Sequence, residues 1–333
     1  MYFTILIIKY ESARIDYVTN QNLFIQRLLL FASAFSLGLL LLIIYRLDVH
    51  ATYSFLPNQV LGVTQPLSQK SPPYLTQPIS FPYIDELVET IPNVSARSVV
   101  VLDTKSMYQL YTLRAHEQLP VASLTKIAAA LVVIEDMDVD AIVTVPTDIE
   151  KIVGSQIGLR PKEQIAVGDL LKGMLISSGN DAAYTLAVNH PRGYDVFVQR
   201  MNEIAYNVGL RHSQFLNPIG YDVAHHYSTA QDMVLLAKKL LSYPLLQDIV
   251  QTQSVRLTGN EGEVVHSLKN TNPLLGKVAD ITGVKTGTSD VAGENFIFSK
   301  KIGERTIIVV ILGSQNRDVD ATMLNYWIDE HYK

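Results

Sequence analysis

The sequence of 333 residues contains no cysteine. This absence excludes disulfide bonds, a cysteine nucleophile and metal sites built from thiolates. It does not assign a cellular compartment, because proteins without cysteine occur in reducing and oxidising surroundings alike. Any nucleophile, base or ligand must therefore come from hydroxyl, amine, imidazole, guanidinium or carboxylate groups.

A block of basic residues is also lacking. The formal net charge is −5, with 27 Lys and Arg against 32 Asp and Glu, and this balance argues against nucleic acid as a partner. The histidines are scattered, and the adjacent pair His225-His226 lacks the i, i+4 spacing that brings two ligands to one metal. The sequence therefore predicts no metal site, no cofactor and no nucleic-acid partner.

One long hydrophobic run stands near the N-terminus. Leu28–Ile44 contains no charge, and with its flanks it matches the hydrocarbon core of a bilayer. Three Lys or Arg residues precede the run, whereas only Arg46 follows it closely. We therefore expect a cytoplasmic segment over 1–22, an uncleaved transmembrane anchor over 23–46 and an exported remainder. A signal peptide cleaved after Val49-His50-Ala51 is the alternative.

Proline is concentrated directly after this run. Between residues 47 and 82 six prolines stand among Gln, Ser and Thr, without a sustained hydrophobic period. This composition is typical of an extended, semi-rigid tether. We expect a linker over 47–82 and one folded domain over 83–333.

The folded domain shows strand patterns at both ends and helical patterns between them. The expected strands are Ser98–Asp103, Met107–Leu113, Ile281–Thr286, Asn295–Ser299 and Thr306–Leu312, and the expected helices are Ala122–Glu135, Val167–Ile176, Asp181–Asn189, Tyr194–Asn207, Ser228–Leu241 and Val319–Glu330. This order predicts an α+β fold, with one antiparallel sheet built from both ends of the domain and a helical block inserted in the middle.

Ser123 and Lys126 stand three residues apart at the start of the first expected helix. Residues at i and i+3 share a helix face, so the hydroxyl and the amine can meet. Two interpretations are open. Ser123 caps the helix while Lys126 reaches water, or Lys126 is a neutral base that activates Ser123 as a nucleophile.

Two further short motifs favour the second interpretation. Ser178-Gly179-Asn180 follows the helix that ends at Ile176, and Lys285-Thr286-Gly287 lies at a predicted strand. Ser-x-x-Lys, a Ser-x-Asn type triplet and Lys-Thr-Gly are together the signature of penicillin-binding proteins and class A β-lactamases. A second Ser-x-Asn, Ser314-Gln315-Asn316, follows the Lys-Thr-Gly and is therefore out of order.

Longer stretches carry a closer resemblance. VASLTKI, LLKGMLISSGNDAAYTLA, GLRHSQFLNPIGYD, HHYSTAQDM and ITGVKTGTSDVAGENF resemble successive blocks of the D-alanyl-D-alanine carboxypeptidases of the low-molecular-mass penicillin-binding protein family. The resemblance covers roughly residues 85–330. It implies the penicillin-binding, β-lactamase-like transpeptidase fold and a serine peptidase that removes the terminal D-alanine from peptidoglycan stem pentapeptides. It also implies acylation by β-lactams.

The resemblance further implies a role for each motif residue. Ser123 is the expected nucleophile and Lys126 the general base, kept neutral by burial and by the nearby charge of Lys285. Ser178 is expected to relay a proton between the lysines and the leaving amine. Asn180 is expected to hold the substrate amide and to orient Lys126.

The Lys-Thr-Gly strand is expected to bind the substrate. Gly287 would let the substrate backbone approach as an added strand, and the amide of Thr288 would join that of Ser123 in an oxyanion hole. Thr286 and Arg317 are the expected contacts of the substrate carboxylate. For Arg317, which follows the last predicted strand, a solvated loop charge is the alternative.

Other functions use related machinery. A class A β-lactamase needs a Glu in a Glu-x-x-Leu-Asn stretch, but Ser213 occupies that position before Leu216-Asn217. A membrane-anchored penicillin sensor needs a cytoplasmic effector, and only about twenty residues precede the hydrophobic run. An endopeptidase or a transpeptidase would carry the same motifs, and the sequence does not separate them from a carboxypeptidase.

Overall fold

The computed structural model describes residues 92–258 and 264–332. The cytoplasmic segment, the anchor and the linker expected at 1–22, 23–46 and 47–82 lie outside the described residues. Among the described helices, none combines the length and the hydrophobicity needed to cross a bilayer.

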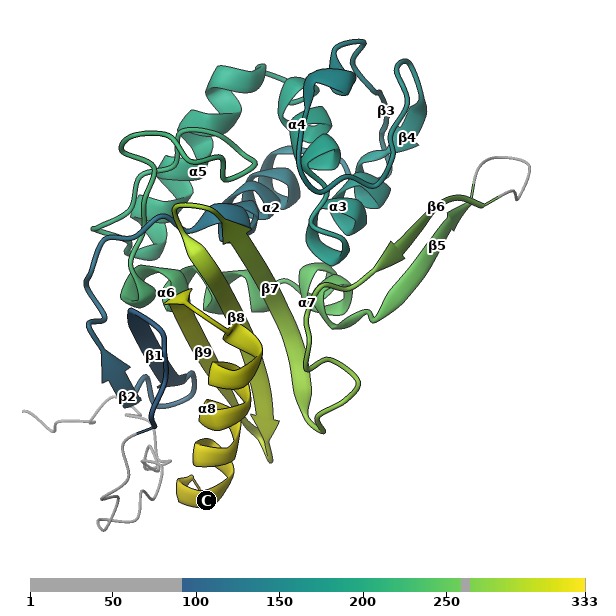
Figure 1. Cartoon of the computed structure of the whole chain (residues 1–333). Coiled ribbons are helices and arrows are strands. Elements are labelled where there is room, and N and C mark those ends of the chain that lie inside the picture. The colour runs from purple at the N-terminus through teal and green to yellow at the C-terminus, as the bar shows by residue number, and fades with distance from the viewer. Residues whose placement is uncertain (1–91, 259–263, 333) are drawn as a thin grey trace, which may run out of the picture. The chain divides into compact units, whose positions relative to one another are not determined.

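Within the described residues, five strands form one antiparallel sheet in the order β2-β1-β9-β8-β7 (Figure 1). The first two strands come early in the domain and the other three come late, so the sheet joins both ends. This confirms the expected α+β arrangement. The strands are β1 (Ser98–Asp103), β2 (Gln109–Leu113), β7 (Ile281–Ser289), β8 (Gly293–Ile302) and β9 (Arg305–Ser314).

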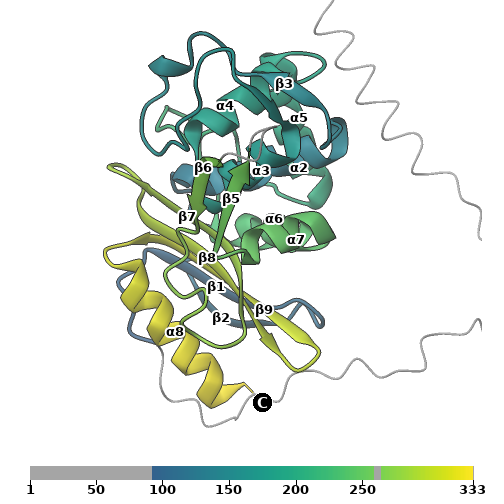
Figure 2. The ribbon, with the colours of Figure 1, turned by 90° about the vertical axis from the view of Figure 1, so that its right-hand side faces the viewer.

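Helices cover both faces of the sheet. Figure 2 shows α8 (Arg317–His331) on one face and α6 (Ala230–Leu241) and α7 (Pro244–Gln251) on the other. Successive side chains of a strand point to opposite faces, so Val100 packs into the core shared with the helical block while Val101 packs into the core beneath α8. Burial on both faces explains why the central strands are continuously hydrophobic.

The helical block lies between β2 and β7 in the chain. Its elements before α6 and α7 include η1 (Ala122–Thr125), α2 (Lys126–Asp136), α3 (Val167–Ile176), α4 (Asn180–Val188) and α5 (Tyr194–Val208). α2 is buried on nearly every side over its first two turns, as expected for a helix that is hydrophobic all round. The bounds expected for α3 to α6 and for α8 agree with the structure to within two residues.

Several short elements were not predicted. β3 (Ile142–Thr144) pairs with β4 (Gln164–Ala166), and three residues are too few to show a period. β5 (Ser254–Thr258) and β6 (Val264–Lys269) form a hairpin of largely polar sequence. α7 does carry a start signal, because Pro244 occupies its first turn.

The expected start of β2 at Met107 is wrong. Met107 has a φ of +59°, outside the extended region, so the strand begins only at Gln109.

Candidate active site

Ser123 and Lys126 meet at the junction of two kinds of helix. The expectation that Ser123 lies in the first turn of an α-helix is wrong, because α2 begins at Lys126 and Ser123 belongs to the 3-10 turn η1. Side chains at i and i+3 eclipse in a 3-10 turn, and Lys126 Nζ lies 2.7 Å from Ser123 Oγ. Ser123 remains partly exposed, whereas Lys126 is 0% exposed.

The Lys126 amine has two more hydrogen-bond partners. These are Asn180 Oδ1 at 2.8 Å and the main-chain oxygen of Ile219 at 2.9 Å. Burial lowers the pKa of Lys126 well below its usual value, the charge of Lys285 lowers it further, and Asp181 acts in the opposite direction. The interpretation in which Lys126 reaches water is therefore wrong, and its environment favours a neutral amine.

Ser178 and Asn180 come from the turn between α3 and α4. Ser178 has a φ of +60°, which is uncommon for a residue other than glycine, and its Oγ accepts a hydrogen bond from Lys285 Nζ at 2.8 Å. Asn180 is the first residue of α4. Its side-chain Nδ2 donates a hydrogen bond to the Val153 main-chain oxygen at 2.6 Å. Its Oδ1 is therefore oriented to accept a hydrogen bond from Lys126.

Asp181 holds this turn in place. It is 2% exposed, and its carboxylate accepts hydrogen bonds at 3.0 to 3.2 Å from the main-chain N–H groups of Ile157, Gly158 and Leu159. A buried carboxylate needs such donors to offset its lost hydration. A Cβ at Gly179 would lie 2.8 Å from Asp181 Oδ1, which explains the glycine in the middle of the motif.

Lys285 is the second buried lysine of the site, at 1% exposure. Its Nζ donates to Ser178 Oγ and to the Thr286 main-chain oxygen, each at 2.8 Å. Burial lowers the pKa of Lys285 to about 7, helped by the charge of Arg317. Both protonation states are thus accessible near neutral pH.

The edge of β7 passes directly beside Ser123. Within the described part of the chain β7 pairs only with β8, and its other edge borders η1. A Cβ at Gly287 would lie 3.0 Å from the Ser123 amide nitrogen and 3.0 Å from the Val121 oxygen, so the close approach requires glycine. A strand edge that pairs with no other strand offers main-chain N–H and C=O groups to an extended peptide.

Arg317 reaches the same end of β7 from the first residue of α8. Its Nη1 donates to Thr288 Oγ1 at 2.6 Å and to the Gly287 oxygen at 3.1 Å, and its side chain is 21% exposed. Arg317 is therefore not a solvated loop charge. The Thr286 hydroxyl, by contrast, shares a hydrogen bond of 2.6 Å with Thr271.

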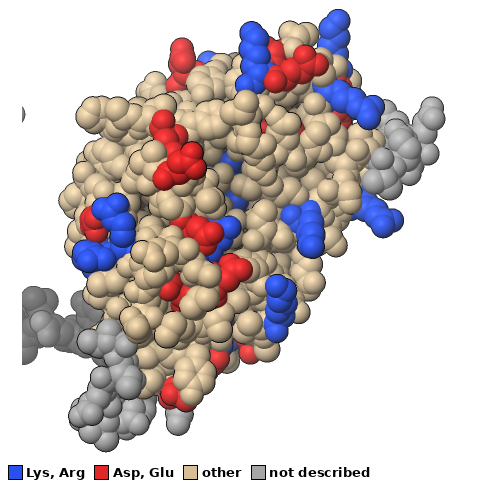
Figure 3. Space-filling view, in the orientation of Figure 1, with Lys and Arg blue, Asp and Glu red and all other residues tan. Residues whose placement is uncertain are grey.

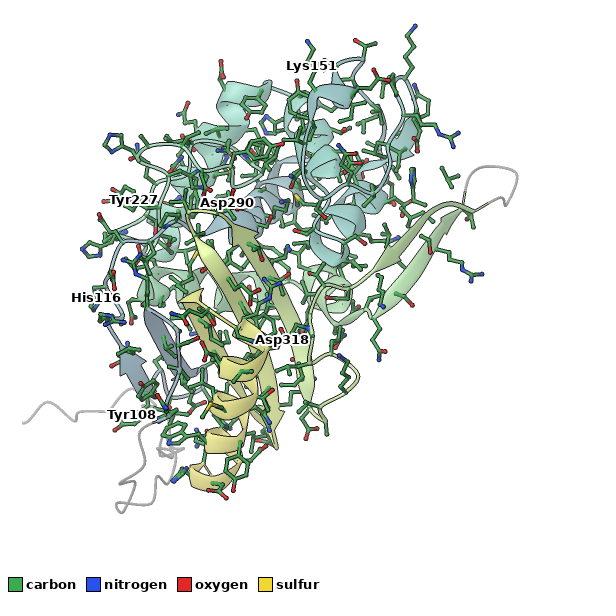
Figure 4. All side chains as sticks on the ribbon, in the orientation of Figure 1. Tyr108, His116, Lys151, Tyr227, Asp290 and Asp318 are labelled. Carbon is green, nitrogen blue, oxygen red and sulfur yellow. The ribbon has the colours of Figure 1, made fainter. Side chains whose placement is uncertain are left out.

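The charged groups elsewhere on this side of the molecule are dispersed. Side chains of both signs are spread over the face shown in Figure 3, and Figure 4 places Asp290 at the turn after β7 and Asp318 in the first turn of α8. Among the residues that the structure describes, no group of three or more His, Asp or Glu side chains could hold a metal ion.

The structure brings most of the expected site residues together. Two groups that help to position them were not predicted from the sequence, the Ile219 carbonyl and the Asp181 carboxylate. The Ile219 carbonyl has no side-chain signal, and the only hint was the turn-forming Asn217-Pro218-Ile219-Gly220. Asp181 follows the Ser178-Gly179-Asn180 motif at the start of a helix, a position where carboxylates are common. That position alone did not indicate that its carboxylate would hold a neighbouring loop.

Comparison with known proteins gives a consistent result. A family model described as D-alanyl-D-alanine carboxypeptidase matches residues 85–316. The D-alanyl-D-alanine carboxypeptidase DacF of Bacillus subtilis is 34% identical over 245 residues, which cover 71% of this chain and 63% of that protein. The chain thus spans less than two thirds of the length of this relative.

Solved structures show the same similarity. The crystal structure of a Streptomyces DD-transpeptidase is 30% identical with a TM-score of 0.67, covering 71% of this chain and 98% of that one. Penicillin-binding protein D2 of Listeria monocytogenes, in its ampicillin-bound form, is 29% identical with a TM-score of 0.61, covering 70% and 97%. These similarities confirm the expected fold, and the chain belongs to the D-alanyl-D-alanine carboxypeptidase family.

Proposed function

We propose that this protein is a serine-type D-Ala-D-Ala carboxypeptidase, which removes the terminal D-alanine from the stem pentapeptide of peptidoglycan. The observation that carries the proposal is the 2.7 Å contact between the buried Lys126 amine and Ser123 Oγ, beside the outer edge of β7. A hydroxyl next to a neutral amine is an activated nucleophile. Membership of the family supports the choice of substrate.

In the proposed first step, Ser123 Oγ attacks the carbonyl carbon of the penultimate D-alanine while Lys126 takes the hydroxyl proton. A C–O bond forms and the C–N bond to the terminal D-alanine breaks. The leaving amine receives a proton from Lys126, relayed by Ser178. The hydrogen bond from Lys285 to Ser178 and the Lys285 pKa of about 7 support this relay.

The substrate is proposed to bind along β7 as an added strand. Gly287 lets β7 lie against the turn that carries Ser123, and the amides of Ser123 and Thr288 polarise the reacting carbonyl. Thr286 and Arg317 are the proposed contacts of the terminal carboxylate. Arg317 suits this role because a guanidinium can bind a carboxylate through two parallel hydrogen bonds.

Water then hydrolyses the acyl-enzyme, with Lys126 again as the base. The departed D-alanine leaves space for that water. We propose that β-lactams acylate Ser123 in the same way, a view supported by the ampicillin-bound Listeria relative. The nitrogen released by β-lactam opening stays tethered to the adduct and hinders water, so this ester should be long-lived.

Release of D-alanine from a pentapeptide stem tests the proposal. The full-length protein in detergent should convert the pentapeptide to the tetrapeptide, followed by mass spectrometry, and should be labelled by a fluorescent penicillin. Ser123→Ala removes the nucleophile and should lose both activities while keeping the circular dichroism of the wild type. A wild-type protein that yields no tetrapeptide, or a variant that keeps its labelling, contradicts the proposal.

We also propose that residues 23–46 anchor the protein in the cytoplasmic membrane, with the domain outside. The uncharged run and the cations that precede it support this topology, and a peptidoglycan substrate requires an exported domain. Membrane fractionation and protease treatment of intact spheroplasts should show a membrane-bound protein whose domain is digested from outside. Recovery of a soluble form that begins after Ala51 would contradict the anchor.

A further inference from the structure

A network of buried polar side chains lies behind Ser123 and Lys126. Thr125, which directly precedes Lys126, is 0% exposed, and His226 and Asn217 are 5% and 9% exposed. His226 Nε2 lies 2.8 Å from Thr125 Oγ1, and His226 Nδ1 lies 3.2 Å from Asn217 Nδ2. The described contacts therefore connect the start of α2 to the loop that contains Asn217.

The partners of Asn217 define the orientation of its amide. Its Oδ1 accepts from the main-chain N–H groups of Ile219, Gly220 and Tyr221 at 3.2, 2.7 and 3.1 Å. Its Nδ2 must therefore donate, and it does so towards His226 Nδ1. The three N–H contacts shape the turn that presents the Ile219 carbonyl to Lys126 Nζ at 2.9 Å.

The same contacts assign the proton on His226. Nδ1 faces two donors, the Leu216 main-chain N–H at 3.4 Å and the Asn217 amide, so it is unprotonated. Nε2 carries the proton and donates it to Thr125 Oγ1. Burial lowers the pKa of His226 to about 4, although the nearby Asp222 carboxylate acts in the opposite direction, so the ring is neutral at physiological pH.

The Ile219 carbonyl helps to determine the direction of the lone pair on Lys126 Nζ. A neutral amine has two N–H bonds and one lone pair. Asn180 Oδ1 and the Ile219 oxygen can only accept, so they take the two N–H bonds of Lys126. The lone pair is then directed at the third neighbour, Ser123 Oγ, 2.7 Å away.

The loop also lies tightly against the nucleophile's own turn. A Cβ at Gly220 would lie 1.9 Å from the Ala122 oxygen and 3.0 Å from the Ser123 nitrogen. Ala122 has a φ of +47°, in the region that L-residues rarely adopt. A small displacement of the Ile219-Gly220 turn would therefore move both the Lys126 lone pair and the Ser123 backbone.

We propose that His226 is a positioning residue for the reaction at Ser123. By donating to Thr125 and accepting from Asn217, it holds the start of α2 and the Ile219 carbonyl in the geometry that aims the Lys126 lone pair at the Ser123 hydroxyl. This inference rests on the proposed function, because it concerns the same nucleophile and base. His226 itself touches neither the substrate nor the reacting atoms.

Rates per active site test the proposal in the full-length protein. The number of active sites is counted by mass spectrometry at saturating penicillin, and acylation and peptide turnover are divided by that number. His226→Leu, which removes donor and acceptor, should lower both the acylation rate constant and kcat by about 10²-fold, the cost of a small misplacement of reacting groups. KM for the peptide should stay within about twofold, because the binding strand is untouched.

Further variants separate positioning from folding. Thr125→Val removes the acceptor with little change in shape and should reproduce the loss, and the double variant should lose no more than either single one. His226→Gln keeps an N–H donor and an oxygen acceptor and should restore most of the rate. The matched control is His190→Leu, because His190 is 4% exposed and bonds to Asp136 at the far end of α2; its rate per active site should be unchanged.

The outcomes distinguish the inference from the proposed function. If the wild type acylates and turns over peptide while His226→Leu and Thr125→Val keep its rate per active site, the positioning role is overturned and the function stands. Additive losses in the double variant, or no recovery in His226→Gln, also overturn it. If the wild type forms no adduct and releases no D-alanine, the proposed function falls and this inference falls with it.

Discussion

Each side of the site buries one lysine, and the two lysines have different surroundings. Lys126, on the helical side, contacts Ser123 and two oxygens that only accept hydrogen bonds, and its pKa is lowered well below the usual value. Lys285, on the strand side, contacts the Ser178 hydroxyl, and its pKa is about 7. Arg317 lies next along the strand side and lowers the pKa of Lys285.

The difference indicates a gradient of positive charge across the site. Arg317 is always charged, Lys285 titrates near neutral pH, and Lys126 is the most strongly biased towards the neutral amine. The charge of Arg317 lowers the pKa of Lys285, and the charge of Lys285 lowers the pKa of Lys126. The strand side is thus suited to bind an anion and the helical side to accept a proton, although both lysines are equally buried.

Of the substitutions that test this difference between the two lysines, Lys126→Met should have the largest effect on activity. It keeps the length of the side chain and removes the amine that contacts Ser123 Oγ. We expect kcat/KM for the pentapeptide to fall by about 10²- to 10⁴-fold, the usual contribution of a general base. Steady-state kinetics with purified protein measures the loss, and a variant within about threefold of wild type would show that another group is the base.

Lys285→Met should have the next largest effect. Loss of its charged hydrogen bonds should lower kcat/KM by about 10²-fold. Removing its charge also raises the pKa of Lys126. Because Lys126 must be neutral to act, the acidic limb of the acylation profile should move to higher pH, and the effect should be largest below pH 7, where Lys285 itself is charged.

A profile of acylation rate against pH, taken with a fluorescent penicillin, measures this shift. Lys285→Arg, which keeps the charge, is the control and should leave the limb nearer to its wild-type position. An unchanged limb in Lys285→Met would mean that burial alone lowers the pKa of Lys126. The gradient of charge would then be wrong, while the role of Lys126 would stand.

Arg317→Leu should have the smallest effect and should act on binding. We expect KM for the pentapeptide to rise about tenfold, equivalent to one charge-assisted hydrogen bond. The matched substrate is a pentapeptide with a C-terminal amide, which the wild type should bind about as weakly as Arg317→Leu binds the acid. If Arg317→Leu still prefers the acid to the amide as strongly as the wild type does, Arg317 does not contact the carboxylate.

Local motifs were predictable because their geometry is contained in a few neighbouring residues. Ser-x-x-Lys places a hydroxyl beside an amine in either a 3-10 turn or an α-helix, so the contact of Ser123 with Lys126 was expected although the helix type was wrong. The periodicity of long buried segments likewise gave α3, α5 and β1 with nearly correct bounds. The assignment of catalytic and binding roles remains a prediction.

Contacts between distant segments were harder to predict. Arg317 reaches Thr288 because Glu294 of β8 pairs with Thr288 on one side and with the last residue of β9 on the other, and α8 begins shortly after β9. The Ile219 carbonyl reaches Lys126 because Asn217 shapes a turn far along the chain. Neither relation has a periodic signal, since both depend on how separate loops pack.

The surroundings of Ser213 bear on how fast water can hydrolyse the acyl-enzyme. Its hydroxyl donates to Asp232 at 2.7 Å and lies 2.7 Å from the Ser228 hydroxyl, so it belongs to a structural network at the start of α6. A hydroxyl is in any case too weak a base to activate water at neutral pH. Lys126 is then the only base proposed for deacylation, and a tethered leaving group should hinder it strongly.

A time course of intact mass therefore tests the account most directly. The full-length protein is mixed with excess pentapeptide in one series and with excess penicillin in another, and Ser123→Ala serves as the blank. We predict a peptide acyl-enzyme that turns over with release of D-alanine, and a penicilloyl adduct on Ser123 that outlives it by several orders of magnitude, each tenfold step being about 1.4 kcal/mol of barrier. A penicilloyl adduct that disappears within seconds, with catalytic hydrolysis of penicillin, would contradict the account and favour a β-lactamase.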